Sequence, residues 1–145
     1  EGGIRAPLIA RWPGRIKPGT LCSQLGATFD LTSSFARITG TQLPSQKLDG
    51  IDLLACAEKN LKPVARNLYW RAKRGDRTWW ATLRNNGTTT RKYIRKKEGG
   101  EVQEWLFNIT EDPGESKNLF ALPDNYGHKL KQQLATWETR VKSLR

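Results

Sequence analysis

Few residues of this sequence combine the type and the spacing that catalysis requires. The chain has two cysteines, Cys22 and Cys56, and one histidine, His128. Neither cysteine belongs to a C-x-x-C pair, and two are too few for a disulfide framework or a zinc site, so we expect buried or half-buried thiols. His128 has no acid or nucleophile patterned around it as a partner in base catalysis. We therefore expect a solvated surface histidine and no catalytic residue.

Asp49 and Asp52 are the acids whose spacing comes closest to that of a metal site. They lie three residues apart around Gly50, beside an apolar patch of undecided type at residues 51–56. A hard cation such as Ca²⁺ needs several converging oxygen ligands. A helix cap and a surface charge are the simpler interpretation, so no metal ligand is predicted in this chain.

Positive charge is concentrated in one stretch of the sequence. The formal net charge is +11, and residues 62–97 hold twelve Lys or Arg residues and one acid, Asp76. Such a field attracts polyanions, whether nucleic acid, sulfated polysaccharide or anionic lipid. The alternative is a solvated strand face whose cations protect the sheet edges. Arg71, Lys73 and Arg74 are the polar residues of most interest here.

The length and composition are those of one ordinary globular domain. The chain has 145 residues, of which 37% are apolar and six are Trp, and this suffices for a core of modest size. No apolar run approaches the roughly 18 to 20 residues of a membrane-spanning helix, and no signal-peptide pattern opens the chain. The sequence contains no Met and starts at Glu1, so we interpret it as a segment of a longer protein.

The middle of the chain predicts an antiparallel sheet. It is rich in Trp, Tyr, Thr and Arg, and Gly-containing links of hairpin length divide it, of which Asn86-Gly87 is the strongest turn signal. The expected strands are residues 67–72, 78–84, 90–96 and 102–109. One face of such a sheet must be covered. The side chains expected on the buried face are Trp70, Trp79 or Trp80, Tyr93, and Trp105 or Phe107.

The end of the chain predicts an amphipathic helix that covers this sheet. It follows a cap at Asp124 or Asn125, and its opposite face is charged and solvated. Its apolar residues recur at spacings of four, three, four and three, at Leu130, Leu134, Trp137, Val141 and Leu144. We expect Trp70, Trp105 and Trp137 to share one core between the sheet and the helix.

The N-terminal part predicts a strand, a turn and a short helix. Residues 7–12 are a mostly apolar run closed by Pro13-Gly14, which favours a buried strand, and Pro18-Gly19 suits a type II turn. Asp30 is the expected cap of a helix that ends at Gly40. If the layers and strands around such a buried strand are missing, apolar side chains stay exposed. Those concerned are Leu8, Ile9, Phe35 and Ile38.

Four sequence blocks stand in a fixed order along nearly the whole chain. They are residues 1–14, EGGIRAPLIARWPG; Asp30-Leu31 opening a helix that ends at Gly40; residues 49–54, DGIDLL; and residues 106–119, LFNITEDPGESKNL. In this order they resemble the C-terminal part of the formylglycine-dependent sulfatases, which are arylsulfatase-like members of the alkaline-phosphatase-like superfamily. Four ordered blocks are far harder to obtain by chance than one short motif.

The resemblance implies an α+β fold in two parts. Residues 1–60 would be the incomplete edge of the sulfatase catalytic α/β domain, with the last strand and helix of its sheet. Residues 61–145 would be a subdomain, a four-stranded antiparallel sheet covered by a C-terminal helix. The resemblance also implies that the parent enzyme hydrolyses sulfate esters with calcium and formylglycine. Neither Cys22 nor Cys56 fits the formylglycine motif C/S-x-P/A-x-R, so we expect no cofactor in this fragment and no activity from it alone.

The same resemblance suggests which residues lie near the substrate. Glu1, Gly2 and Gly3 would be adjacent to the active site, and Arg71, Lys73 and Arg74 could form part of a substrate rim. The implied partners are a sulfated substrate and the missing N-terminal catalytic portion, with no specific nucleic acid and no membrane. The family further implies an exported protein, whether periplasmic, extracellular or lysosomal.

Other interpretations stay open at the level of sequence. The basic stretch with its interleaved Trp and Tyr residues also suits a module that binds polyanions or single-stranded nucleic acid. A related phosphodiesterase or phosphonate hydrolase could share the same blocks. Asn86-Gly87-Thr88 and Asn108-Ile109-Thr110 fit the glycosylation sequon, a pattern that also arises often by chance.

Overall fold

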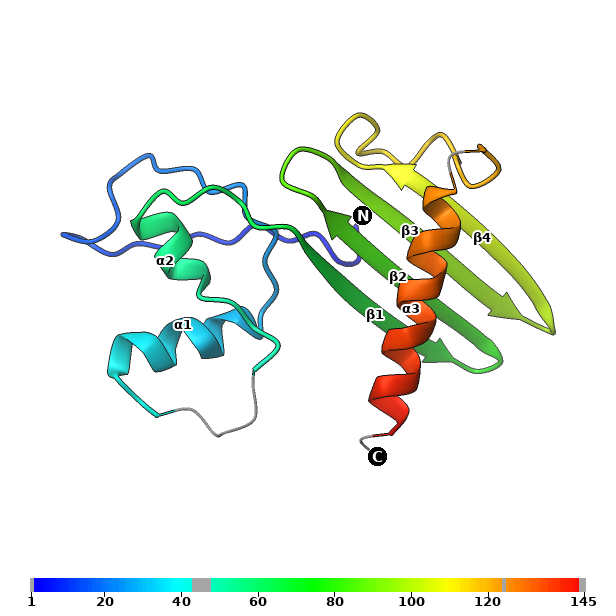
Figure 1. Ribbon diagram of the computed structural model, residues 1–145, viewed down its shortest axis with the longest axis horizontal. Coiled ribbons are helices and arrows are strands. Elements are labelled where there is room, and N and C mark those ends of the chain that lie inside the picture. Colours follow the sequence, from blue (N-terminus) through cyan, green and yellow to red (C-terminus); the bar gives the residue numbers. More distant parts are fainter. Residues whose placement is uncertain (1, 43–47, 124, 144–145) are drawn as a thin grey trace. The chain divides into compact units, whose positions relative to one another are not determined.

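The structure is a computed structural model that describes residues 2–42, 48–123 and 125–143. The chain divides into two compact units. The N-terminal unit is Arg5–Val64, and the sheet unit is Ala65–Arg145 together with Glu1–Ile4. In Figure 1 the helices of the N-terminal unit are cyan and green, and the strands and helix of the sheet unit run from green to red.

The sheet unit is built on an antiparallel meander of four strands (Figure 1). They are β1 (Arg66–Arg74), β2 (Arg77–Asn85), β3 (Thr90–Glu98) and β4 (Glu101–Asn108), and each pairs with the next in sequence order. The aromatic and β-branched residues of this stretch suit a pleated, half-buried surface. The predicted sheet is confirmed.

Gly-containing links join all the strands. The β3–β4 link is Gly99-Gly100, with φ angles of +55° and +92°. A two-residue hairpin link of this kind needs left-handed backbone at both positions, which glycine adopts without a Cβ clash. The β2–β3 link, residues 86–89, is longer, and a hydrogen bond from the Asn86 N–H to the Thr89 carbonyl at 3.1 Å closes it.

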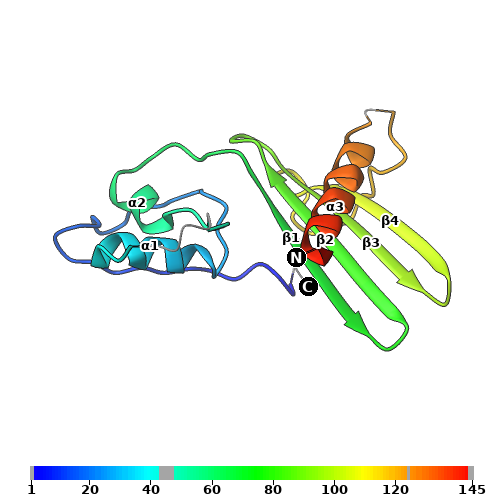
Figure 2. The ribbon, with the colours of Figure 1, turned by 60° about the horizontal axis from the view of Figure 1, so that its bottom comes forward.

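The helix α3 (Tyr126–Lys142) covers one face of the sheet, as predicted. Figures 1 and 2 show it crossing β2 and β3. Its inward positions Leu130 and Leu134 are fully buried, and burial of each such side chain contributes about 1.5–3 kcal/mol. The core cluster consists of Trp80, Tyr93, Leu106, Leu130 and Leu134.

The start of α3 differs in detail from the prediction. Its N-cap residue is Asn125, in the left-handed conformation with φ +53°, and the Asn125 side chain makes no capping hydrogen bond. Asp124, the other expected cap, and Leu144 lie outside the described residues. At the other end, Arg140 and Lys142 occupy the last turn, where positive charge interacts favourably with the helix dipole.

The prediction that Trp70, Trp105 and Trp137 share one core is wrong for the first two. Trp137 does pack against the core, stacked on Tyr69 with ring centroids 5.2 Å apart. Trp70 and Trp105 belong to a cross-strand row one residue out of step with the core, and side chains alternate along a strand, so they lie on the face that α3 does not cover. The two rows are Trp70–Ala81–Ile94–Trp105 and Tyr69–Thr82–Tyr93–Leu106.

The second face of the sheet is apolar as well. Toward the β1–β2 link, Trp79 is 39% exposed and stacks on Trp105 with ring centroids 6.1 Å apart. The cross-strand row nearer the β2–β3 link is buried and consists of Leu68, Leu83, Lys92 and Phe107. The sheet therefore carries apolar residues on both faces.

In the N-terminal unit, α1 (Asp30–Thr39) and α2 (Leu53–Glu58) lie side by side (Figures 1 and 2). Gly40 ends α1 with a φ of +67°, which confirms the predicted stop. The undecided patch at residues 51–56 contributes most of α2. Asp52 is the N-cap of α2 and accepts a hydrogen bond from the Ala55 N–H at 2.9 Å, which confirms its interpretation as a helix cap.

Asp30 does not cap α1 as predicted. The N-cap residue is Phe29, and Asp30 is a fully buried residue of the first turn. Its carboxylate accepts hydrogen bonds from the Ala27 N–H at 2.6 Å and from the Ile51 N–H at 2.9 Å. The side chain therefore ties the segment before α1 to the segment before α2, a long-range role that a local pattern does not reveal.

Residues 7–12 do not form the predicted strand, and their backbone is irregular. Leu8 is 57% exposed and Ile9 is 90% exposed. A strand that is apolar on both sides needs paired strands at its edges and covering layers on its faces. The described residues offer this segment neither. Phe35 and Ile38 are exposed too, as expected.

Candidate functional site

The predicted rim residues lie on β1, an edge strand of the sheet. Arg71, Lys73 and Arg74 are all exposed. Arg71 pairs with Trp80 and Lys73 with Thr78, on the face that α3 covers. Arg74 is one residue further along, so it belongs to the opposite face. The structure thus brings Arg71 and Lys73 together and separates Arg74 from them.

Lys97 joins this pair through the sheet. It pairs with Thr78, which in turn pairs with Lys73, and its side chain is exposed. We call Arg71, Lys73 and Lys97 the cationic end of the sheet unit. Adjacent strands lie about 4.8 Å apart, so the backbones of Lys73 and Lys97 are roughly 10 Å apart. Side chains as long as those of lysine can reach one anionic ligand from both strands. Sequence reasoning missed Lys97 because cross-strand register is not local information.

Arg95 lies next to the cationic end but is already compensated. Its guanidinium carbon is 4.0 Å from the Trp80 ring centroid, and its Nη2 atom is 3.0 Å from the Glu138 carboxylate on α3. Trp80 also donates its indole N–H to Glu138. These contacts hold Arg95 in the layer between sheet and helix. The positive charge of Arg95 is therefore balanced by Glu138 within the sheet unit.

A second polar cluster lies between the sheet and α3. The Tyr93 hydroxyl donates to Glu104, and Lys131 Nζ lies 2.9 Å from the same carboxylate. Burial raises the pKa of Glu104, but the hydrogen bonds from Tyr93 and Lys131 outweigh it, so the pKa lies below its ordinary value. Burial and the Glu104 contact raise the pKa of Tyr93 well above its usual range. Both groups thus keep one protonation state near neutral pH, which suits a structural role better than proton transfer.

A buried ion pair lies on the other face of the sheet. Lys92 Nζ is 2.7 Å from a Glu115 carboxylate oxygen, and the two side chains are 4% and 18% exposed. Burial raises the pKa of Glu115, but the hydrogen bond and charge of Lys92 act against it, and the pKa is lowered overall. Glu115 belongs to the sequence block at residues 106–119. Glu115, one of the three acids of that block, therefore fastens the loop after β4 to β3.

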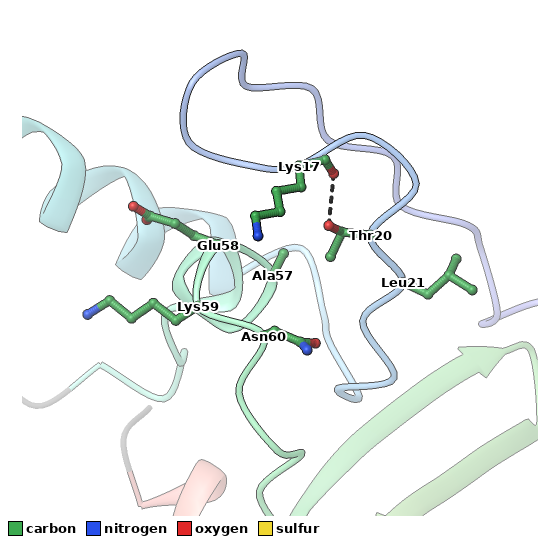
Figure 3. A pocket seen from close by; sticks show the side chains of 7 residues that line it. All are labelled: Lys17, Thr20, Leu21, Ala57, Glu58, Lys59 and Asn60. Atoms are coloured by element: carbon green, nitrogen blue, oxygen red, sulfur yellow. Dashed lines mark hydrogen bonds between the residues drawn. The ribbon is translucent and has the colours of Figure 1, made fainter.

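A pocket of about 370 Å³ lies in the N-terminal unit (Figure 3). Its one carboxylate, Glu58, accepts a hydrogen bond from Arg15 Nε at 2.6 Å and also pairs with Arg37. The hydrogen bond from Arg15 is the main cause of the lowered pKa of Glu58. A carboxylate held in this way is a poor general base. The residues that line the pocket are Lys17, Thr20, Leu21, Ala57, Glu58, Lys59 and Asn60.

The wall of this pocket contains the predicted turn at Pro18-Gly19. The Thr20 hydroxyl donates to the Lys17 carbonyl at 2.8 Å, the dashed line in Figure 3. The Thr20 N–H donates to the same carbonyl at 3.3 Å, and Gly19 has a φ of +74°. This geometry is that of the expected turn.

The remaining candidate residues do not form a reactive site. Cys22 is exposed, so the expectation of a buried or half-buried thiol is wrong for it, while Cys56 is buried and donates to the Asp52 carbonyl at 3.4 Å. His128 is exposed, as expected, and lies against Phe120 with ring centroids 5.3 Å apart. Among the described residues, no three His, Cys, Asp or Glu side chains are grouped closely enough to hold a metal ion. Nor does that part of the chain contain a helix with the length and apolarity to cross a membrane.

The expected active-site neighbours at the start of the chain are only partly described. Glu1 lies outside the described residues, while Gly2 and Gly3 form an exposed turn. A Cβ atom added to Gly2 or Gly3 would meet open space within this chain. Both glycines belong to the sheet unit although 60 residues of the other unit follow them in sequence.

The sequence of this chain matches a known family over almost its whole length. The model of the family described as N-sulphoglucosamine sulphohydrolase, C-terminal, matches residues 1–141. Bovine (Bos taurus) arylsulfatase A is 30% identical over 136 residues, which cover 82% of this chain and 27% of that protein. N-acetylgalactosamine-6-sulfatase of the dog (Canis lupus familiaris) is 47% identical over 55 residues, which cover 37% of this chain and 10% of that protein.

The fold is also that of a solved protein with a sulfated sugar bound to it. The structure of BT4656 in complex with its substrate D-glucosamine-2-N,6-O-disulfate matches with a TM-score of 0.62 at 18% identity, over 92% of this chain and 27% of that chain. The four-stranded antiparallel sheet with its C-terminal helix is shared, which confirms the expected α+β arrangement. This chain spans about a quarter of the length of bovine arylsulfatase A and of BT4656. It belongs to the family of N-sulphoglucosamine sulphohydrolase C-terminal regions.

Proposed function

We propose that the protein of which this chain is part hydrolyses sulfate esters, and that this chain is its C-terminal part and supports the active site without supplying the reacting groups. The observation that carries the proposal is the family match over residues 1–141. The chain spans 27% of bovine arylsulfatase A, so most of a sulfatase has no counterpart in it.

The reacting groups of the proposed enzyme lie elsewhere in the protein. The formylglycine nucleophile requires a C/S-x-P/A-x-R motif, and neither Cys22 nor Cys56 begins one. Calcium requires several converging oxygen ligands, and the described residues do not fit it, because they contain no cluster of acids able to hold a metal ion. We propose that the calcium and the formylglycine of the family belong to the part of the protein that this chain does not span.

The proposed support role divides the chain in two. Residues 1–60 form an edge of the catalytic α/β domain, with Glu1, Gly2 and Gly3 next to the active site, and residues 61–145 form the C-terminal subdomain. Two features support this division. Leu8 and Ile9 are strongly exposed for apolar residues, and the sheet has a second apolar face around Trp79 and Trp105. Exposed apolar surface of this kind is typical of an interface, and its partner is the catalytic portion of the same protein.

The proposed share in substrate choice lies at the cationic end. Arg71, Lys73 and Lys97 are exposed and lie at one end of the sheet, and Arg74 lies at the same hairpin on the other face. Arg and Lys side chains bind sulfate oxygens through charge-assisted hydrogen bonds. The related proteins named for a sulfated amino sugar and bound to a sulfated glucosamine support a sulfated sugar as the substrate class. An exported location agrees with such a substrate.

The first test is an assay of the chain alone. The purified chain should not hydrolyse an aryl sulfate, with or without added calcium, because the nucleophile is missing. Turnover above the buffer rate that persists through repurification would refute the support role, while leaving sulfatase membership intact.

The second test is a chimera in which this chain replaces the matched region of bovine arylsulfatase A. The chimera should be recovered folded at higher yield than arylsulfatase A truncated at the same point. In the folded chimera, Arg71→Ala/Lys73→Ala should raise KM for a disulfated sugar several-fold with little change in kcat, while Lys129→Ala on the solvent side of α3 should leave both unchanged. An unchanged KM in the double variant would remove these residues from the substrate rim. A yield no higher than that of the truncated enzyme would contradict the support role.

A further inference from the structure

The two glycosylation sequons of the chain lie in opposite environments. Asn86-Gly87-Thr88 occupies the link between β2 and β3, and all three residues are exposed. Asn108-Ile109-Thr110 begins at the last residue of β4, where Asn108 and Ile109 are each 8% exposed. The sequence pattern alone makes no distinction between them. Only the surroundings of the two sequons in the structure distinguish them.

At Asn86 the side chain is already folded toward the hydroxyl of its sequon. The Asn86 Oδ1 atom accepts hydrogen bonds from the Thr88 hydroxyl and the Thr88 N–H, each at 3.1 Å, and from the Thr89 N–H at 2.8 Å. All three bonds use the amide oxygen. No hydrogen bond described for this link uses Asn86 Nδ2, the nitrogen that would accept a sugar, and the residue itself is exposed. The neighbouring bond from Asn85 Nδ2 to Thr90 Oγ1 at 2.8 Å closes the base of the link.

At Asn108 the residues of the sequon make hydrogen bonds that hold the end of the sheet together. The Thr110 hydroxyl oxygen accepts a hydrogen bond from the Thr90 N–H at 2.8 Å, so this hydroxyl joins β3 to the end of β4. The Asn108 carbonyl accepts the N–H groups of Glu111 and Asp112 at 3.1 and 2.8 Å. A glycan on Asn108 would have to be attached to a buried side chain at the point where the sheet ends, whereas bulky glycans belong on surfaces.

We propose that Asn86 is a site for an N-linked oligosaccharide and that Asn108 is not. In the transfer, the bond between the anomeric carbon of the oligosaccharide and its lipid pyrophosphate carrier breaks, and a bond from that carbon to Asn86 Nδ2 forms. The amide loses one proton, and the lipid pyrophosphate leaves with the electron pair of the broken bond. The Thr88 hydroxyl positions the amide through the bond to Oδ1. The site requires passage through a glycosylating compartment, which agrees with the exported location proposed above.

The experiment is secretion of the whole chain, behind an added leader, from a eukaryotic host that attaches N-glycans. The leader makes the test independent of the natural location and of sulfatase activity. Secreted folded protein is treated with peptide N-glycosidase in ¹⁸O-water and mapped by mass spectrometry. The isotope distinguishes a released glycan from spontaneous deamidation, to which an Asn-Gly pair is prone. Asn86→Gln and Thr88→Ala should abolish the glycan, Thr88→Ser should restore it at least in part, and Asn108→Gln should leave it unchanged.

Each result decides the proposal. One glycan, at Asn86 and lost in the two disruptive variants, supports it. Secreted chain without any glycan overturns it, and so does a glycan at Asn108, alone or together with Asn86. A Thr88→Ala chain that keeps its glycan would exclude the proposed part of the hydroxyl.

Discussion

Several ionisable side chains of the sheet unit are used to join its layers. Glu104 links Tyr93 on β3 to Lys131 on α3, and Glu115 holds Lys92 from the loop after β4. Both carboxylates are partly buried, and both keep a lowered pKa because their partners outweigh the effect of burial. Glu104 and Glu115 therefore have a structural role in this unit.

Because the pKa values of Glu104 and Glu115 are lower in the folded chain than the ordinary value of 4.5, the unfolded chain takes up these protons first as the pH falls. Their contribution to stability is present above pH 4.5 and is lost as the pH drops through the lowered folded values. We expect urea midpoints measured from pH 7 to pH 2.5 to fall steeply below about 4.5. Glu104→Gln should flatten that fall, whereas Glu111→Gln, at an exposed site, should not. Equal slopes in the two variants would contradict this role.

The Lys92–Glu115 pair gives a second prediction at this scale. Lys92→Met takes the ammonium group of Lys92 away from a carboxylate in a largely buried site, which should lower the free energy of unfolding by about 3 kcal/mol. Lys92→Met combined with Glu115→Gln removes the carboxylate charge as well and should recover part of the loss. Urea unfolding followed by circular dichroism measures both. A double variant less stable than Lys92→Met would show that the charge is not the cause.

Among the elements, α3 depends on a close approach near its start. A Cβ atom on Gly127 would lie 2.7 Å from Phe120 Cδ2 and 3.6 Å from Leu106 Cδ2. The stiff Phe120 ring, which also packs against Tyr93, cannot yield as a flexible chain end would. Glycine at this position is therefore a packing requirement, although alanine is the better helix former.

We expect Gly127→Ala to lower the free energy of unfolding by about 1–3 kcal/mol, since overpacking outweighs a gain in helix propensity of about 1 kcal/mol. Gly114→Ala is the matched control, because its Cβ would make an ordinary contact at 3.8 Å. Phe120→Leu should couple with Gly127→Ala in a double-mutant cycle. A Gly127→Ala chain as stable as the original would place the ring elsewhere in solution.

Local patterns predicted the elements better than they predicted which residues meet. The strands, the Gly-containing links and α3 follow from residue type and periodicity, since these are local properties. The prediction that Trp70, Trp105 and Trp137 share one core was wrong, because the face of the sheet on which a side chain lies depends on cross-strand register. The role of Asp30 was missed because its partner, Ile51, is 21 residues away.

The candidate site shows the same division. Arg71 and Lys73 could be selected from a basic stretch, whereas Lys97 joined them only through the pairing of β1, β2 and β3. The four family blocks predicted the α+β fold, because a resemblance to a family carries its long-range contacts along with its local sequence. They did not anticipate that residues 7–12 lack a strand here, since the described residues offer that segment no neighbouring strand.

At the scale of the whole molecule, the two units differ in how their backbone is held. Over the residues that the structure describes, the sheet unit has four paired strands and a covering helix, while the N-terminal unit has two short helices and much irregular backbone. Exchange of an amide hydrogen requires local opening, which is easiest where few buried contacts and ladder bonds resist it.

We expect amide hydrogens of residues 5–64 to exchange much faster than those of residues 66–142, with Ala27 and Ile51 as slower exceptions because both donate to the buried Asp30 carboxylate. Hydrogen–deuterium exchange read by mass spectrometry measures this on the intact chain. Asp30→Ala should speed exchange at residues 27 and 51 and leave β3 unchanged. Uniform slow exchange along both units would contradict the proposed edge of a larger domain.

The two apolar faces of the sheet also bear on how its strands find their alignment. In a sheet with one apolar face, a shift of a strand by one residue exposes its apolar side chains to water, so burial of apolar surface alone disfavours the wrong register. Here such a shift of β4 would bring Trp105 to the side of Leu106, one apolar side chain for another. Glu104 would at the same time turn away from Tyr93 and Lys131. Glu104 thus contributes to the specificity of strand alignment as well as to stability. Its contacts with Tyr93 and Lys131 form in only one of two alignments that are nearly equivalent in apolar burial.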